Sequence, residues 1–439
     1  MSAMMTKDVS SKADTKKAPS DHQHPGDPHL RNYNAAMKVN KGSEPSGTIT
    51  SGGASMPILP TGKVVASSDA YARLLDAELP RKAPPTCGLS LAEFFCCAGG
   101  IGLGFRSSGF RLAFANDISK HAAASYARNL GHEPIVRDIR EVGLKDYGEL
   151  VGKVDVVTGG FPCVTFSMAG RRMGVNDDLH GKLYLELCRV INELRPRYFV
   201  AENVEGILSA NGGNAVKLVL AEFLRLGYRT TYELVNMAEH GVPQTRMRVI
   251  FVGVRLDEWR GAFIFPRRTR RMAKDKKAFL GLPLARTLRD AIGDLPPPSN
   301  GDEQHDRNDS PVSPSYEMTK RVAKASAPSP TIVSETANVQ LRIIAARNPD
   351  FSNPMRSVEE PSVTMTSSGA AEVGMNTGEL RRMTVRECAR VQSFPDWYRF
   401  EGGQSEGYKQ IGNAVPPLYT KQLAQALKEY DARSKEGKQ

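Results

Sequence analysis

The stretch that decides the fold is LSLAEFFCCAGGIG, residues 89–102. Its first seven residues are nearly all apolar, which is typical of a buried strand, and glycines follow where the chain must turn tightly. Five more runs resemble strands: Arg111–Asn116, Ile135–Arg137, Val154–Thr158, Tyr198–Ala201 and Val249–Val254. Helix-like stretches lie among them at Lys120–Leu130, Lys182–Leu194 and Ala215–Leu226. Strands that alternate with helices predict an open, doubly wound α/β fold with a mostly parallel sheet.

Composition narrows the class of protein. The 439 residues carry 59 Lys and Arg against 48 Asp and Glu, a net charge of +11 that predicts an acidic partner such as nucleic acid. No run reaches the roughly 18 consecutive apolar residues of a membrane helix, and we expect no membrane partner. The six cysteines form no CxxC pair, which indicates reduced thiols. The eight histidines show no zinc spacing, so no metal site is predicted.

Composition and hydrophobic periodicity change along the chain. Residues 1–86 are polar and predict a disordered tail, with one short helix from Ala70 to Leu79 as its only element. The α/β pattern covers 87–256, and an irregular, smaller domain is expected over 257–378. Helical texture returns over 379–430, before a polar tip at 431–439. A basic run at 267–277 holds seven Lys and Arg against one acid and accounts for about half of the charge excess.

Acidic and glycine residues follow the first strands, where ligands of parallel sheets bind. Gly99 and Gly100 open a helix, Asp117 ends the next strand about 20 residues on, and Asp138 follows the third. Taken by themselves, the two glycines are explained as well by a tight structural turn as by a cofactor-binding loop. Together with an acid that can accept both hydroxyls of a ribose, they favour a nucleoside-bearing cofactor.

Three further strand ends carry reactive side chains. Cys163 follows Pro162 after the strand at 154–158; most cysteines are inert small hydrophobes, but a thiolate at a helix start is a nucleophile. Glu202 comes directly after the strand at 198–201. A carboxyl group there can hold a proton when it is buried, and a role as a helix cap is an equally good explanation. Residues 244, 246 and 248 alternate along an extended segment, so Gln244, Arg246 and Arg248 are expected on one face, although surface arginines are commoner.

In this order, the motifs resemble the signature of the cytosine-C5 DNA methyltransferases, of the bacterial restriction-modification type. The resemblance covers about 89–258 and 379–428. It includes two late motifs, RRMTVRECARVQSFP at 381–395 and YKQIGNAVP at 408–416. It implies a Rossmann-like methyltransferase domain over 87–256, a target-recognition domain over 257–378, and a C-terminal segment at 379–430 that returns to the catalytic domain.

The resemblance implies S-adenosyl-L-methionine as the cofactor. By position, Phe95 stacks near the adenine, Gly99 and Gly100 flank the methionine part, and Asp117 holds the ribose. The remaining implied cofactor residues are Ile118, Asp138, Ile139, Pro162, Leu183, Asn413, Ala414 and Val415.

The resemblance also implies the reaction, DNA (cytosine-5-)-methylation. Cys163 attacks C6 of a flipped cytosine, Glu202 protonates or hydrogen-bonds N3, Arg248 binds O2, and Arg246 supports Glu202 and the loop. The implied DNA contacts are Phe161, Ser167, Asn203, Gln244, Arg267, Arg268, Arg270, Arg271 and Lys274. A tRNA cytosine-5 methyltransferase and a non-catalytic DNA-binding regulator are the alternatives.

The expected partner is duplex DNA, bound by a monomer, with a separately acting restriction endonuclease left open. The implied location is the cytoplasm, at the nucleoid, in a prokaryote, or the nucleus in a eukaryote. Two residues depart from the family pattern: Cys97 stands where a glycine is usual, and Val164 replaces the usual Gln after the nucleophile.

Overall fold

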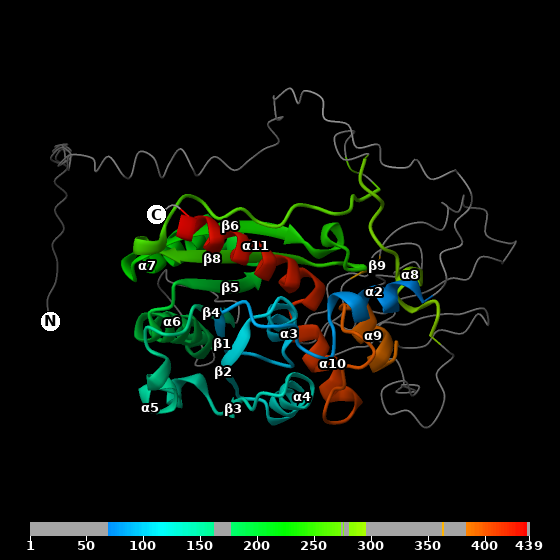
Figure 1. Cartoon of the computed structure of the whole chain (residues 1–439), viewed down its shortest axis with the longest axis horizontal. Helices are drawn as coiled ribbons and strands as arrows, with labels where there is room; N and C mark the ends of the chain where they lie inside the picture. Colours follow the sequence, from blue (N-terminus) through cyan, green and yellow to red (C-terminus); the bar gives the residue numbers. More distant parts are fainter. Residues whose placement is uncertain are drawn as a thin grey trace, which may run out of the picture. The chain divides into compact units, whose positions relative to one another are not determined.

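A seven-stranded sheet forms the centre of the protein, seen here in a computed structural model that describes residues 69–161, 177–273, 275, 281–295, 362–363 and 383–436 (Figure 1). The strand order is β3-β2-β1-β4-β5-β8-β6. The first five of these strands run parallel, whereas β8 runs antiparallel to both β5 and β6. The strands span β1 Ser90–Phe94, β2 Arg111–Asp117, β3 Ile135–Val136, β4 Val156–Gly160, β5 Tyr198–Val204, β6 Tyr228–Asn236 and β8 Met247–Arg255. The predicted doubly wound, mostly parallel α/β fold is therefore confirmed.

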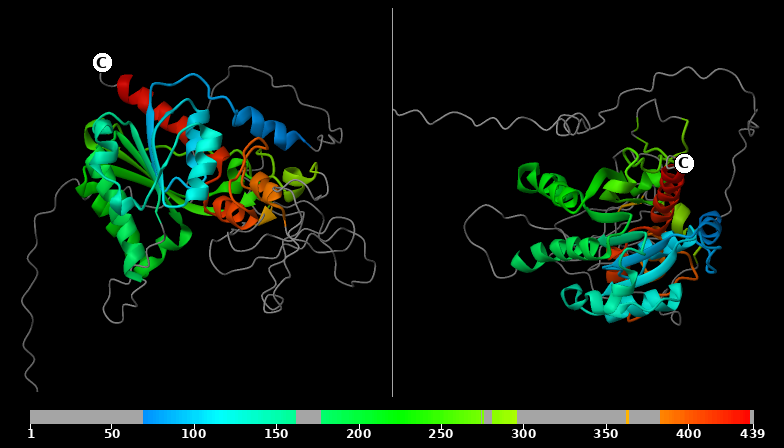
Figure 2. Two further views of the ribbon diagram at one scale, coloured as in Figure 1. Left: turned by 90° about the horizontal axis from the view of Figure 1, so that it is seen from below. Right: turned by 60° about the vertical axis from the view of Figure 1, so that its left-hand side comes forward.

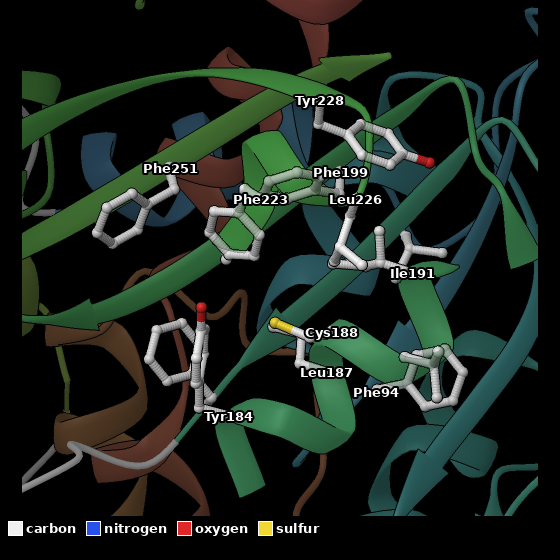
Figure 3. Close-up of a cluster of buried hydrophobic side chains, with 14 of the residues drawn as sticks. Phe94, Tyr184, Leu187, Cys188, Ile191, Phe199, Phe223, Leu226, Tyr228 and Phe251 are labelled. Atoms are coloured by element: carbon white, nitrogen blue, oxygen red, sulfur yellow. The ribbon is translucent and has the colours of Figure 1, made fainter. Parts of the chain in front are cut away.

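Helices cover both faces of the sheet because successive strand residues point to opposite sides. On one face, Phe94, Phe199 and Phe251 pack with α6 (Asp177–Leu194) and α7 (Asn214–Arg225) (Figure 3). On the other, Leu91 and Val200 pack with α3 (Gly100–Ser107) and α11 (Pro417–Glu436). Figure 2 shows α3 and α11 on the opposite side of the strands from α6 and α7.

The smaller elements complete the frame. Two of them follow β2 and β3, namely α4 (Lys120–Leu130) and α5 (Leu144–Tyr147). Beside the main sheet, β7 (Gln244–Thr245) pairs with β9 (Ser362–Val363). Helices α8 (Leu288–Ile292), α9 (Val385–Val391) and α10 (Gln404–Asn413) pack near the carboxyl edge of the sheet. No helix among the described residues is long and apolar enough to span a bilayer.

Strand β6 was not expected from the sequence. It is an edge strand, and between the buried residues Tyr228 and Val235 the side chains of Arg229, Thr230 and Thr231 are half-exposed and that of Glu233 is exposed. An edge strand with polar residues on both faces lacks the apolar run by which the inner strands were found.

The expectation of a polar tail up to residue 86 is wrong for residues 69–86. Helix α2 (Ala70–Glu78) forms where a short helix was allowed, and Tyr71, Leu75 and Leu79 are almost completely buried. The packing involves only a few large apolar side chains, those of Tyr71, Leu75 and Leu79 with Leu74 partly buried beside them, which is why composition concealed it. Residues 1–68 lie outside the described part of the chain.

Helices α3 and α11 approach closely at Gly104. A Cβ on Gly104 would lie 2.1 Å from Thr420 Oγ1 and 2.5 Å from the backbone nitrogen of Lys421. The hydroxyl of Thr420 donates a hydrogen bond to the carbonyl of Gly100 at 2.9 Å. This contact joins the C-terminal segment to the helix that follows the glycine loop.

We expect Gly104→Ala to lower the free energy of unfolding by about 1–3 kcal/mol, because a backbone would have to move away from the new methyl group. Gly148→Ala is the matched control, since nothing lies within 4 Å of its added Cβ, and it should be neutral or slightly stabilising. Chemical denaturation of both variants measures the difference. Equal stabilities would contradict the close approach of the two helices.

Candidate active site

A cavity of about 620 Å³ opens at the carboxyl ends of β1, β2, β4 and β5. The N-terminal end of β8 reaches the same edge because β8 runs antiparallel to β5. Eleven of the residues expected to bind cofactor, cytosine or DNA line this one cavity: Phe95, Gly100, Asp117, Phe161, Glu202, Asn203, Arg246, Arg248, Asn413, Ala414 and Val415.

The loop between β1 and α3 adopts an unusual backbone. Phe95 and Cys97 have φ of 52° and 47°, in the left-handed region that non-glycine residues rarely enter. The amide of Cys97 donates to Asp117 Oδ2 at 2.8 Å, and its Sγ lies 3.4 Å from the carbonyl oxygen of Gln410. Cys97 therefore occupies a glycine-like conformation and is held there by contacts with two other segments. Burial raises the pKa of its thiol, which stays neutral.

Gly100 allows the start of α3 to lie directly against the motif at 408–416. A Cβ at this position would lie 2.2 Å from the carbonyl oxygen of Val415. Gly99, at φ of 79°, precedes the helix and has no side chain to cap it, so that among the first amides of α3 the side-chain bond is that of Gly102 to Glu93. The free N–H groups of a helix start favour an anionic group such as a carboxylate.

Asp117 lies beside this loop, at the end of β2. Its Oδ1 accepts a hydrogen bond from the amide of Ser119 and its Oδ2 one from Cys97, both at 2.8 Å. Burial raises the pKa of Asp117, and these backbone hydrogen bonds oppose the rise. Each carboxylate oxygen has a further lone pair, so the group can still accept hydroxyl hydrogens from a ligand.

Glu93 lines the same cavity and was missed from the sequence. It is 1% exposed, accepts hydrogen bonds from the hydroxyl of Tyr126 at 3.1 Å and the amide of Gly102 at 3.2 Å, and so serves as a cap for α3 from the neighbouring strand. Burial raises the pKa of Glu93 to about 8, despite those two hydrogen bonds. A single acid inside an otherwise apolar strand was the available signal.

Glu202 and Arg248 form a buried ion pair on the two adjacent strands. Arg248 Nε lies 2.8 Å from Glu202 Oε1, and Arg248 Nη1 donates to the carbonyl of Met247 at 2.8 Å. Burial lowers the pKa of Arg248, and Glu202 opposes that change. The pair presents a carboxylate and a guanidinium, both held by their partners, to the cavity.

Arg246 is the largest fully buried side chain among the described residues. Its Nη2 donates to the carbonyl of Gly412 at 3.1 Å, while Nε and Nη1 meet no hydrogen-bond partner among the described residues. Burial lowers its pKa, as does the nearby charge of Arg248. Arg246 thus links the start of β8 to the end of α10.

Asn203 and Gln244 differ in their environment. Asn203 Nδ2 donates to the carbonyl of Phe161 at 3.1 Å and fixes the backbone two residues before Cys163. Gln244, Arg246 and Arg248 are all buried, with half-buried residues between them, but Gln244 does not line the cavity as the two arginines do. Gln244 is fully buried outside the cavity, and its amide has no partner in the described part of the chain.

Five of the expected cofactor residues do not line the cavity, namely Gly99, Ile118, Asp138, Ile139 and Leu183. Asp138 pairs with Arg140 at 2.5 Å, and that hydrogen bonding lowers its pKa. Ile139 is buried in the core, and Leu183 packs partly buried against it. Ile118 is 69% exposed next to Asp117. Cys163, Pro162, Val164, Ser167 and Lys274 lie outside the described residues.

The basic run includes two arginines that brace backbone. Arg270 Nη1 donates to the carbonyl of Leu284 at 2.7 Å, and Arg271 Nε to that of Leu282 at 3.1 Å. Burial and the charge of Arg286 lower the pKa of Arg270 to about 10. Arg268 pairs with Glu239 at 3.0 Å, and Arg267 is exposed. The two carbonyls lie more than ten residues away from these arginines along the chain, so the sequence did not indicate that the arginines bind backbone.

Helix α10 supplies cavity residues that the motif did not single out. Glu406, Lys409 and Gln410 line the opening, and Glu406 pairs with Lys409 at 2.7 Å. No group of three His, Cys, Asp or Glu suitable for a metal ion occurs within the described ranges.

An open α/β sheet with an acid-and-glycine cavity at its carboxyl edge, extended by a buried Glu–Arg pair, defines a nucleoside-binding group-transfer enzyme. Residues 89–429 match the family model of the C-5 cytosine-specific DNA methylases. The chain belongs to that family and is a DNA cytosine methyltransferase. It is 33% identical to the type II methyltransferase M.NgoFVII of Neisseria gonorrhoeae, over 77% of this chain and 86% of that protein. It is 32% identical to M.FnuDI of Fusobacterium nucleatum, over 78% and 94%.

The fold is also similar to solved structures. The crystal structure of the S. pombe Dnmt2 methyltransferase superposes with a TM-score of 0.52 at 16% identity, covering 78% of this chain and 98% of that one. This likeness concerns the arrangement of helices and strands.

We expect Glu93→Gln to change how stability depends on pH. With a pKa near 8 in the folded protein and near 4.5 in the unfolded chain, Glu93 stabilises most fully below pH 4.5, and this contribution is lost as the pH rises through 8. The amide does not titrate. From pH 5 to 8 the melting temperature of the variant should therefore rise relative to wild type, by an equivalent of at most about 1.4 kcal/mol per pH unit.

Glu141→Gln, at an exposed carboxylate, is the control and should keep a nearly constant offset from wild type. A constant offset for Glu93→Gln as well would mean that Glu93 is ionised in the folded protein over this range.

Proposed function

We propose that this enzyme transfers the methyl group of S-adenosyl-L-methionine to C5 of a cytosine flipped out of a specific duplex DNA sequence. One observation carries the proposal: the buried Glu202–Arg248 pair lines the same cavity as the glycine loop and Asp117. One cavity therefore offers both an acid and a glycine loop that suit a nucleoside and an ion pair that suits charge on a base.

The cavity residues fit this cofactor. Asp117 has acceptor capacity left for ribose hydroxyls, and Phe95 and the exposed Ile118 offer apolar surface beside it. The first turn of α3, whose N-cap residue Gly99 has no side chain to offer, suits the carboxylate of the methionine part. When bound, the cofactor supplies an electrophilic methyl group. We propose that Gly100, Asn413, Ala414 and Val415 enclose it, with Asp138, Ile139, Leu183 and Pro162 as supporting residues.

The proposed nucleophile is the thiolate of Cys163. Its sulfur forms a bond with C6, and the electron pair of the C5–C6 double bond shifts toward C4 and N3, which gives an enamine that is nucleophilic at C5. C5 then takes the methyl group, while the bond between that methyl and the sulfur of the cofactor breaks and leaves the neutral thioether S-adenosyl-L-homocysteine. A base, such as water, then removes the C5 proton. The C6–S bond breaks, the double bond is restored and the thiolate leaves.

The ion pair explains why the ring accepts this charge. As negative charge develops on the base, Glu202 protonates or hydrogen-bonds N3 and the guanidinium of Arg248 binds O2. Both groups are already oriented, because each is held by the other and Arg248 also by the carbonyl of Met247. Preorganised groups of this kind typically contribute about 10²–10³-fold in rate. We assign Arg246 to positioning, through its bond to Gly412.

Extrusion of the base costs a few kcal/mol, which contacts to DNA must supply. We propose residues 257–378 as the target-recognition domain and the segment 379–430 as its return to the catalytic domain. Phe161, Ser167, Asn203 and Gln244 are proposed to act near the flipped base, and the basic run near phosphates. We further propose that the enzyme acts as a monomer and that a separate restriction endonuclease accompanies it, as the type II names of its relatives suggest.

The covalent step is tested with duplex DNA that contains 5-fluorocytosine. Fluorine at C5 cannot leave as a proton does, so the methylated adduct should persist and shift the protein in a denaturing gel. Cys163→Ser should give neither adduct nor methyl transfer, whereas Cys87→Ser, at a half-buried thiol outside the cavity, should give both. Wild-type protein that methylates tRNA but no duplex DNA, or an adduct formed by Cys163→Ser, would overturn the proposal.

Arg267→Gln should weaken DNA binding and flatten its salt dependence. Loss of one phosphate contact reduces the slope of log K against log salt by about one. Lys217→Gln, at an exposed residue of α7, is a control of equal charge change and should leave the slope unchanged. Fluorescence anisotropy at several salt concentrations measures both slopes. Identical slopes for Arg267→Gln and wild type would remove Arg267 from the DNA contacts.

A further inference from the structure

Helix α2 precedes the family match, which begins at residue 89, yet it is built into the core. Tyr71, Leu75 and Leu79 belong to one buried cluster with Cys96 and Leu103 of the cofactor-loop region. A helix whose apolar residues are all covered by distant segments is part of the fold, even where composition resembles a tail.

The C-terminal end of α2 is fixed by three segments. Trp397 Nε1 donates to the carbonyl of Leu79 at 3.1 Å, and Arg106 Nη2 donates to the carbonyls of Pro80 and Arg81 at 3.1 and 2.9 Å. Lys421 of α11 pairs with Glu78 at 2.7 Å. These bonds connect α2 with α3, with α11 and with the loop after α9.

The other end of α2 faces α8. The guanidinium of Arg286 lies over the ring of Tyr71, 5.0 Å from its centroid. Leu288, Ala291 and Ile292 of α8 share the buried cluster with Tyr71 and Leu75. A cation over an aromatic ring and a shared apolar core both favour one fixed placement of the two helices.

Helix α8 is in turn tied to α9. Arg390 of α9, 3% exposed in its side chain, donates to the carbonyl of Ala291 at 3.1 Å and pairs with Asp294 at 2.8 Å and Asp396 at 2.5 Å. Helix α8 comes just before residues 296–382 and α9 just after them. The two helices that flank residues 296–382, a segment that holds most of the proposed recognition domain, are thus held together next to α2.

We infer that α2 is a positioning element for DNA recognition: it clamps α8 and α9, which flank residues 296–382 and with them most of the proposed recognition domain, onto the catalytic fold. The inference rests on the proposed function, because it assigns the segment between α8 and α9 to DNA. Tyr71, Leu75 and Trp397 touch none of the reacting groups and act through the placement of these two helices.

The test uses the full chain with Leu75→Ala, which removes buried methyl groups between α2 and α8. Hydrogen exchange at the amides of α8 and α9 should become about tenfold faster, and that of α6 and α7 should stay unchanged. The KM for duplex DNA should rise about fivefold at nearly constant kcat, as expected when binding alone is lost. Arg73→Gln, at an exposed residue of α2, is the matched control and should alter neither measurement.

Trp397→Phe is the second variant, since it keeps an aromatic ring and removes the hydrogen bond to Leu79. It should shift both measurements in the same direction by a smaller factor. Unchanged exchange at α8 and α9 in Leu75→Ala, or faster exchange without any change in the KM for DNA, would overturn the inference. If wild-type protein methylates no DNA, the proposed function fails, and the exchange data still decide whether α2 clamps the two helices.

Discussion

The antiparallel direction of β8 is the constraint on which the active site depends. In a parallel sheet, every strand brings its C-terminal end to the ligand edge, but β8 brings Arg248, near its N-terminal end, beside Glu202, which lies near the C-terminal end of β5. The two charges then satisfy one another in a buried setting, where either alone would be strongly destabilising. One reversed strand thereby adds a charged group to an edge that would otherwise hold only strand ends and loops.

Much of this site could be predicted from the sequence, because a polar residue that directly follows an apolar strand can be recognised from a few neighbouring residues. Asp117 and Glu202 follow apolar runs, and parallel strands bring such residues to one edge. Arg246 and Arg248 line the cavity as the alternating spacing indicated. Gln244 does not: it lies in β7, which pairs with β9 beside the main sheet, and this pairing with a distant segment leaves no mark in the local sequence.

What escaped prediction depended on contacts between distant segments. Strand β6 is polar at an edge, α2 buries three side chains only because α8, α9 and α11 surround it, and Arg270 and Arg271 find carbonyls in residues 282–284. Glu93 looked like an isolated charge, and its hydrogen bonds to Tyr126 and Gly102 join three elements. Neither composition nor periodicity can indicate partners that only tertiary structure supplies.

Helices α8 and α9 are locked to each other by Arg390, so the segment between them begins and ends at one rigid place. The entropic cost of closing such a loop grows only slowly with its length. Insertions, deletions and wholesale exchange of the intervening residues can therefore accumulate without strain on the sheet. The same catalytic frame can, in this way, acquire new target sequences during evolution through changes confined to a single replaceable module.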